Sequence, residues 1–263
     1  MAAVATEIAK NSIDGLLLLT PDESMEKSRH PFVGLVDHIA VMPLFDGESG
    51  NDLSNNTLSK NTPNGQTATF IGSQLRDAGV QVLLYGNAHP DRTPLADVRR
   101  YRTNFFLSGG LDTSGEGELR DPKGVATVGA PPTFVENFNI RLTANCDRSM
   151  ARSLTKMLRE RDGGLLGVEG LTLPYSNNRT EIACNLLRPD VGSADAITER
   201  AHQWALEQVE SSSFEGTEDL IETGYRVGTT AEQCLQVLSL SSAELKIHDV
   251  QVKTRLTGFL GLL

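Results

Sequence analysis

Cysteine is scarce in this sequence, and the spacing of its few cysteines argues against a metal site and against a disulfide framework. Three cysteines occur among 263 residues, and no two of them form a CxxC pair. No histidine stands at metal-ligand spacing from any of them. Cys146, Cys184 and Cys234 are therefore expected to be free thiols in a reducing compartment, with neither a metal site nor a disulfide framework.

Long apolar runs and an excess of basic residues are also missing. The longest apolar run near the start, residues 16–19, is too short to span a bilayer and lacks the basic flank of a secretory signal. The formal net charge is -10, and a surface of that sign repels nucleic acid and anionic membranes. We therefore expect a cytoplasmic protein with neither nucleic acid nor membrane as a partner. An anionic small molecule would bind only where local donors outweigh the overall charge.

What is present is the composition and patterning of a globular chain. Hydrophobic residues make up 39% and charged residues 22%, which is an ordinary balance for a folded domain. Helical spacing of apolar residues predicts helices at residues 2–13, 67–77, 93–102, 147–162, 197–208 and 230–240. Asp147 is expected to cap one of these helices, and Thr230 with Gln233 fits a capping box for the last. Apolar or alternating runs predict strands at residues 36–44, 80–85, 125–129, 134–142, 165–173 and 182–186.

The order of these elements predicts an α+β fold of two ferredoxin-like units. They occupy residues 1–124 and 125–240, and a tail follows at residues 241–263. The first unit begins with a helix and lacks the strand that should precede it, so it is expected to be incomplete at its N-terminus. Within this unit, residues 108–124 contain five glycines and are either a flexible connector or a backbone-rich ligand loop.

Four segments, in a fixed order, carry a resemblance to a known family. They are HPFVGLVDHIAVMPL at residues 30–44, VQVLLYGNAH at 80–89, KGVATVGA at 123–130 and EIACNLLRP at 181–189, with RERDGGL at 159–165 in the same register. Together they resemble the formiminotransferase family, most closely its plant-like formiminotransferase-cyclodeaminase-like branch, with the N-terminal part truncated. The resemblance implies two α/β subdomains whose sheets face each other across a folate-binding cleft, and commonly a homodimer.

The resemblance also implies a reaction and a catalytic residue. The family moves a formimino group from formiminoglutamate, an amino-acid-derived donor, to N5 of its co-substrate tetrahydrofolate. N5 must lose a proton while the departing glutamate amine gains one, and one imidazole with a pKa near neutral can do both. The family's catalytic histidine lies in an HP-x-x-G motif that matches His30. Without the motif, His30 would be read as an ordinary loop histidine. His38 is interpreted as a structural strand residue and His89 as a distant second candidate.

Two further segments match the family's folate-contacting stretches, where glycine lets the backbone approach a flat heterocycle. The alternative interpretation is a solvated loop followed by a core strand, with core packing favoured for Leu166, Val168 and Leu171. Lys123 and Arg120 either pair with the folate carboxylate or are ordinary surface cations. The predicted folate-binding residues are Gly115, Glu116, Gly117, Glu118, Leu119, Arg120, Asp121, Pro122, Lys123, Gly124, Gly164, Leu165, Leu166, Gly167, Val168, Glu169, Gly170, Leu171, Thr172 and Leu173.

Departures from the family pattern favour binding over turnover. Phe32 stands where the family commonly has arginine, so a candidate clamp for the donor carboxylate is lost. The family's opening strand, helix and strand are missing as well. One alternative is therefore a catalytically weak folate-binding or scaffold protein that retains the fold. Another is a gene fragment that folds only in part or only with a partner.

Overall fold

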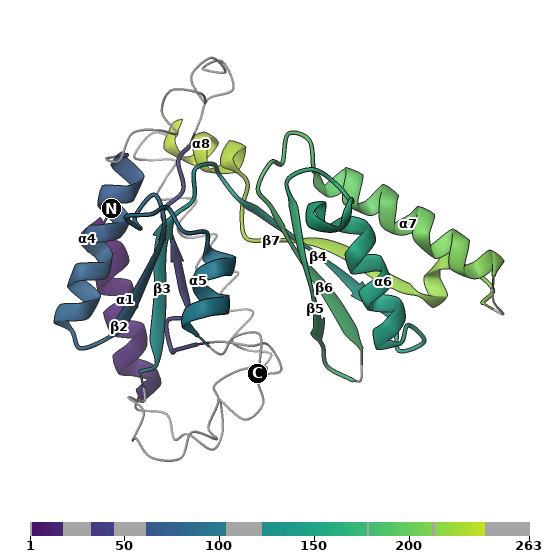
Figure 1. The fold of residues 1–263 in the computed structure, drawn as a ribbon, viewed down its shortest axis with the longest axis horizontal. Coiled ribbons are helices and arrows are strands. Elements are labelled where there is room, and N and C mark those ends of the chain that lie inside the picture. The colour runs from purple at the N-terminus through teal and green to yellow at the C-terminus, as the bar shows by residue number, and fades with distance from the viewer. Residues whose placement is uncertain are drawn as a thin grey trace.

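Residues 2–17, 33–44, 62–103, 123–177, 179–211 and 214–239 are described by a computed structural model (Figure 1). In these ranges the chain forms one parallel sheet of three strands and one antiparallel sheet of four strands. Helices pack on both sheets (Figure 1). The mixed helix and strand content confirms the predicted α+β class.

The first sheet has the strand order β1-β3-β2, and both of its strand pairs are parallel. Its strands are β1 (His38–Ala40), β2 (Gln81–Gly86) and β3 (Val125–Ala130). Helices α1 (Ala2–Leu17) and α4 (Pro63–Asp77) cover one face, because their apolar stripes share a core with that face of the sheet. Helix α5 (Leu95–Arg102) lies on the opposite face, which is turned toward the second unit (Figure 1).

Strand β3 lies in the first sheet, although the sequence placed it in the second unit. The sequence shows why it is central: five of its six residues are buried, as a strand covered on both faces requires. A continuous apolar run does not indicate which sheet it joins, because that depends on pairing with strands far away in the chain. We therefore propose that the two units divide within residues 131–135, rather than between Gly124 and Val125.

The second sheet has the strand order β5-β6-β4-β7, and all its neighbouring strands are antiparallel. Its strands are β4 (Glu136–Leu142), β5 (Val168–Pro174), β6 (Thr180–Leu186) and β7 (Ile221–Val227). Helices α6 (Arg148–Leu158) and α7 (Ala194–Glu210) cover one face around the fully buried Trp204. The other face is turned toward α5 and the first unit (Figure 1).

Strand β7 was not predicted, and its position at the edge of the sheet explains why. An edge strand needs less apolar surface than a central one, and no residue of β7 is fully buried. Gly224 also interrupts the pattern at mid-strand. A Cβ atom at Gly224 would lie 2.7 Å from Cζ of Phe138 on the neighbouring strand, so packing against that ring accounts for the glycine.

The predicted caps are confirmed where the helices begin. The Asp147 carboxylate accepts a hydrogen bond from the Met150 N–H at 2.8 Å at the start of α6. Before α8 (Ala231–Ser239), the Gln233 N–H donates to the Thr230 hydroxyl at 3.1 Å, and the Thr230 N–H donates to the Gln233 side chain at 3.0 Å. Within the ranges given above, no helix is both long and apolar enough to cross a membrane.

Replacing Asp147 by alanine is expected to lower the free energy of unfolding by about 1 kcal/mol, because the cap at the start of α6 is lost. Urea denaturation followed by far-UV circular dichroism measures the change. Asp147→Asn, which retains an oxygen acceptor, serves as the control and should lose much less. Equal losses in the two variants would show that the cap hydrogen bond is not the cause.

Candidate functional site

A cavity of about 610 Å³ lies between α5 of the first unit and the open face of the second sheet. One wall is the side of α5 that carries Leu95, Ala96, Arg99 and Arg100. The opposite wall comes from β5, from β6 and from the turn at Arg159, Glu160 and Arg161. The cavity is therefore built from segments of both units that are far apart in the sequence.

The floor of the cavity follows from strand alternation. In β5 and β6 every second residue points away from the α6/α7 core, so Leu171 and Ala183 lie opposite each other on the open face. Leu173 and Leu187 extend this apolar surface. Polar groups border it on one side, where the Asn185 amide donates to the Glu169 carboxylate at 3.3 Å. The result is a flat apolar floor with a hydrogen-bonding edge.

Arginine dominates the charge around the cavity, with four arginines against two glutamates in its lining. Three of these arginines have carboxylate partners outside the lining: Arg99 pairs with Asp37 at 2.5 Å, Arg100 with Asp97 at 2.6 Å, and Arg159 with Asp162. The hydrogen bond from Arg159 lowers the pKa of the Asp162 carboxyl. Arg161 is exposed, and within the described ranges no hydrogen bond or ion pair engages it.

The second predicted folate-binding stretch reaches the cavity only in part. Val168, Glu169, Gly170, Leu171 and Leu173 line it. Thr172 faces α6 instead, where its hydroxyl lies 2.6 Å from that of Thr155. Residues 164–167 form the turn that leads into β5 and are not in the lining.

Core packing was expected for three residues of this stretch, and it is confirmed for one. Val168 is buried in the core of the second unit. Leu166 is 55% exposed, so the expectation was wrong there, because it lies in the turn before the strand begins. Leu171 is half-buried and lies on the cavity floor, because its position in β5 points it away from α6.

Lys123 and Gly124 are the only residues of the first predicted stretch within the described ranges, since residues 115–122 lie outside them, as does His30. The Lys123 ammonium donates to the carbonyl of Ala78 at 3.0 Å, at the end of α4, and Lys123 is absent from the cavity lining. This contact holds its side chain at the C-terminal end of α4.

Gly34 and Gly124 lie next to each other. Gly34 follows His30 in the HP-x-x-G motif, and Gly124 ends the first predicted folate-binding stretch. The two glycines form an isolated antiparallel bridge, supported by a hydrogen bond from Val125 N–H to Val33 O at 2.8 Å. A Cβ atom on Gly34 would lie 2.5 Å from the Val125 carbonyl oxygen, so a side chain is excluded. The close approach observed at this glycine of the HP-x-x-G motif is that of another backbone segment.

A polar cluster on the cavity-facing side of the first sheet was not predicted. His38 begins β1, as expected of a strand residue, and its Nε2 lies 2.8 Å from the Tyr85 hydroxyl. Arg99 bonds to the Asp37 carboxylate and to the Thr127 hydroxyl, at 2.5 and 3.2 Å. The only sequence signal was Asp37-His38 at the start of an apolar strand, which by itself does not distinguish a site from a strand end.

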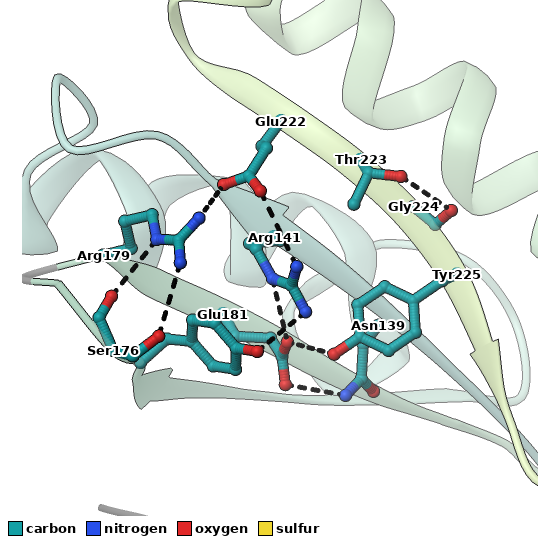
Figure 2. A network of polar contacts seen from close by, with 10 residues as sticks. Asn139, Arg141, Ser176, Arg179, Glu181, Glu222, Thr223, Gly224 and Tyr225 are labelled. Atoms are coloured by element: carbon teal, nitrogen blue, oxygen red, sulfur yellow. Dashed lines mark hydrogen bonds and ion pairs between the residues drawn. The ribbon is translucent and has the colours of Figure 1, made fainter. Parts of the chain in front are cut away.

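A second polar network covers the open face of β4, β6 and β7 (Figure 2). Glu181 is only 1% exposed, and it accepts hydrogen bonds from the Tyr225 hydroxyl and, at 2.8 Å, from the Asn139 amide. Arg141 lies 3.9 Å from this carboxylate, with its guanidinium 4.3 Å from the Tyr175 ring centre and 5.1 Å from that of Tyr225. Burial and the hydrogen bond to Glu181 raise the pKa of Tyr225, which keeps the phenol protonated.

This network continues the cavity floor, because Glu181 pairs directly with Leu173 across the β5–β6 register. Its two guanidinium groups, from Arg141 and Arg179, are balanced by the carboxylates of Glu181 and Glu222. A balanced and mutually hydrogen-bonded set of this kind stiffens the sheet and supplies no net charge to a ligand. In the part of the chain that the structure describes, no cluster of histidine, cysteine and carboxylate side chains could hold a metal ion.

Comparison with known proteins supports the resemblance seen in the motifs. No protein-family model matches the chain. A curated Arabidopsis thaliana protein named formiminotransferase cyclodeaminase-like protein is 31% identical over 185 residues, which is 64% of this chain and 57% of that protein. The chain thus matches little more than half the length of that relative. This similarity confirms the resemblance to the formiminotransferase family.

Proposed function

We propose that this chain binds tetrahydrofolate in the cavity between its two units and acts as a formiminotransferase-like one-carbon transferase. The observation that carries the proposal is that Val168, Glu169, Gly170, Leu171 and Leu173 line one cavity, and the family resemblance assigns these residues to folate. A volume of about 610 Å³ falls within the range of small-molecule sites, roughly 300–1,000 Å³.

The chemistry of the lining suits the parts of a folate. The apolar floor at Leu171 and Ala183 offers a flat surface for the pterin, and Glu169 and Asn185 offer hydrogen-bonding groups at its edge. The glutamate tail of a folate is anionic, and Arg161 is a cation at the cavity wall whose guanidinium can pair with a carboxylate. Local positive charge of this kind offsets the net charge of -10.

In the proposed reaction, N5 of tetrahydrofolate attacks the formimino carbon of formiminoglutamate. A new C–N bond forms at N5, and the bond from that carbon to the glutamate nitrogen breaks. We propose that the His30 imidazole accepts the proton that N5 loses and then donates it to the departing glutamate amine, so that the imidazole is regenerated.

We also propose that the second unit has a ferredoxin-like fold. The element order β4-α6-β5-β6-α7-β7 and the strand order β5-β6-β4-β7 support this, because both are those of the β-α-β-β-α-β unit. The homodimer and the cytoplasmic location implied at the sequence level stay predictions.

Tetrahydrofolate at 100 times its dissociation constant is expected to stabilise the protein by about 2.7 kcal/mol, because a ligand that binds only the native state shifts unfolding. Differential scanning fluorimetry measures this as a rise in melting temperature of several degrees.

Arg161→Ala should weaken binding about 3- to 10-fold by removing a partner of the ligand carboxylate.

Arg152→Ala is the matched control, since Arg152 is exposed on α6, behind the other face of the second sheet. It should bind as tightly as the unmodified protein. An unchanged melting temperature at millimolar tetrahydrofolate would refute the proposed function. Equal losses in the two arginine variants would remove Arg161 from the site.

A further inference from the structure

Three polar side chains form a row across the open face of the second sheet. Glu169 on β5 is in register with Asn185 on β6, and Asn185 is in register with Asn137 on β4. Side chains of directly paired residues lie on the same face of a sheet, so the three are neighbours. Glu169 and Asn185 line the cavity. The Glu169 end of this row therefore belongs to the cavity wall.

The hydrogen bonds along this row all run in one direction. The Asn137 amide donates to the side-chain oxygen of Asn185 at 2.7 Å, and the Asn185 amide donates to the Glu169 carboxylate at 3.3 Å. An ionised carboxylate only accepts hydrogen bonds, which fixes the orientation of the Asn185 amide and, through it, that of Asn137. The row therefore holds the Glu169 side chain in place and ends on acceptor oxygens.

The Glu169 carboxylate keeps acceptor capacity for a ligand. Its two oxygens can accept about four hydrogen bonds. Among the described residues, the Asn185 amide is the only hydrogen-bond or ion-pair partner of its side chain. Three of the four arginines in the lining pair with other carboxylates. Glu169 is exposed, so a ligand in the cavity can reach its oxygens.

The position of this carboxylate beside the apolar floor suits a pterin. The paired floor residues Leu171 and Ala183 lie two positions along their strands from Glu169 and Asn185. Two residues of a strand span roughly 7 Å, a distance comparable with the length of two fused rings. On the pyrimidine ring of a pterin, the 2-amino group and N3–H are adjacent donors. Such a pair matches the two oxygens of one carboxylate in a bidentate arrangement.

We propose that the Glu169 carboxylate recognises the pterin by accepting hydrogen bonds from its 2-amino group and N3–H, and that Asn185 and Asn137 are positioning residues that hold the carboxylate for this contact. This inference rests on the proposed function, since the ligand is the folate. It also orients the pterin. With the pyrimidine edge at Glu169, the second ring, which carries N5, lies over Leu171 and Ala183.

The test compares the dissociation constants of 5-formyltetrahydrofolate, a stable probe, and its 2-desamino analogue, in which hydrogen replaces the 2-amino group. The unmodified protein should bind the analogue about 10-fold more weakly, because one charge-assisted hydrogen bond is lost. Glu169→Gln should bind the probe about 10- to 30-fold more weakly and should distinguish the two ligands by less than about 2-fold. Asn185→Ala should reduce their ratio to about 3-fold, a change that lost stability alone does not produce.

Glu199→Gln is the matched control, because Glu199 is exposed on α7, behind the opposite face of the second sheet. It should bind both ligands as the unmodified protein does. A Glu169→Gln variant that keeps the full ratio between the ligands would overturn the inference. An unchanged dissociation constant of the probe with a raised KM for formiminoglutamate would also overturn it, by assigning Glu169 to the donor. Failure of the unmodified protein to bind the probe would instead refute the proposed function, and the inference with it.

Discussion

Glu181→Ala is expected to lower the free energy of unfolding by about 3 kcal/mol, the lower end of the range for breaking a buried ion pair. The Glu181 side chain is only 2% exposed, and its removal leaves the Tyr225 hydroxyl and the Asn139 amide without their common acceptor. It also removes one of the two carboxylates that pair with Arg141. The loss stays at the lower end because Arg141 keeps Glu222 at 3.6 Å and is itself 22% exposed. Urea denaturation followed by circular dichroism measures it.

Glu222→Ala is the matched control, because it removes a different carboxylate that also contacts Arg141 (Figure 2). The Glu222 side chain is 36% exposed, and its ion pairs with Arg141 and Arg179 are screened by water. We expect its loss to cost less than about 1 kcal/mol. Similar losses in the two variants would show that burial of Glu181 does not set the energetics of this network.

His30→Ala is expected to lower kcat/KM for transfer from formiminoglutamate to tetrahydrofolate by about 100- to 10,000-fold, because one general acid–base group is removed from both proton transfers. The assay follows the appearance of 5-formiminotetrahydrofolate spectrophotometrically. Tetrahydrofolate binding, measured by the shift in melting temperature, should change far less, since the imidazole acts on the reacting atoms.

His202→Ala serves as the control and should retain full activity, because His202 is exposed on α7. Equal rates in the unmodified protein and His30→Ala would remove His30 from the mechanism. Binding of tetrahydrofolate without any turnover by the unmodified protein would instead select the alternative of a catalytically weak folate-binding protein. Phe32, in place of the family's usual arginine, is the sequence feature that points to this alternative.

Local patterns predicted most of the elements in the described ranges. The Asp147 cap and the Thr230–Gln233 capping box occur where they were expected, because a cap depends on residues three positions apart. The helix around Trp204 was predicted from apolar spacing, and that spacing is what buries the indole. Strand β7 was missed because an edge strand carries little apolar signal.

The candidate site was only partly predictable, because its walls come from segments that are distant from each other in the chain. The motifs indicated the stretch at residues 164–173, but alternation within β5 decides that Leu171 reaches the cavity while Thr172 faces α6. Arg99 and the His38–Tyr85 pair carry no such signal, since the residues that they contact are distant in the chain. Arg161 lines the cavity together with segments of the other unit.

By itself, the sequence determined the α+β class, the positions of most helices and strands, and the resemblance to the formiminotransferase family. Only the tertiary structure decided that β3 joins the first sheet, that the open face of the second sheet meets α5, and that a cavity lies between them. The physical reason is the separation along the sequence between the residues that interact. Helix periodicity, strand alternation and caps depend on residues within a few positions of each other, whereas strand pairing and cavity walls depend on surfaces that meet only after the chain has folded.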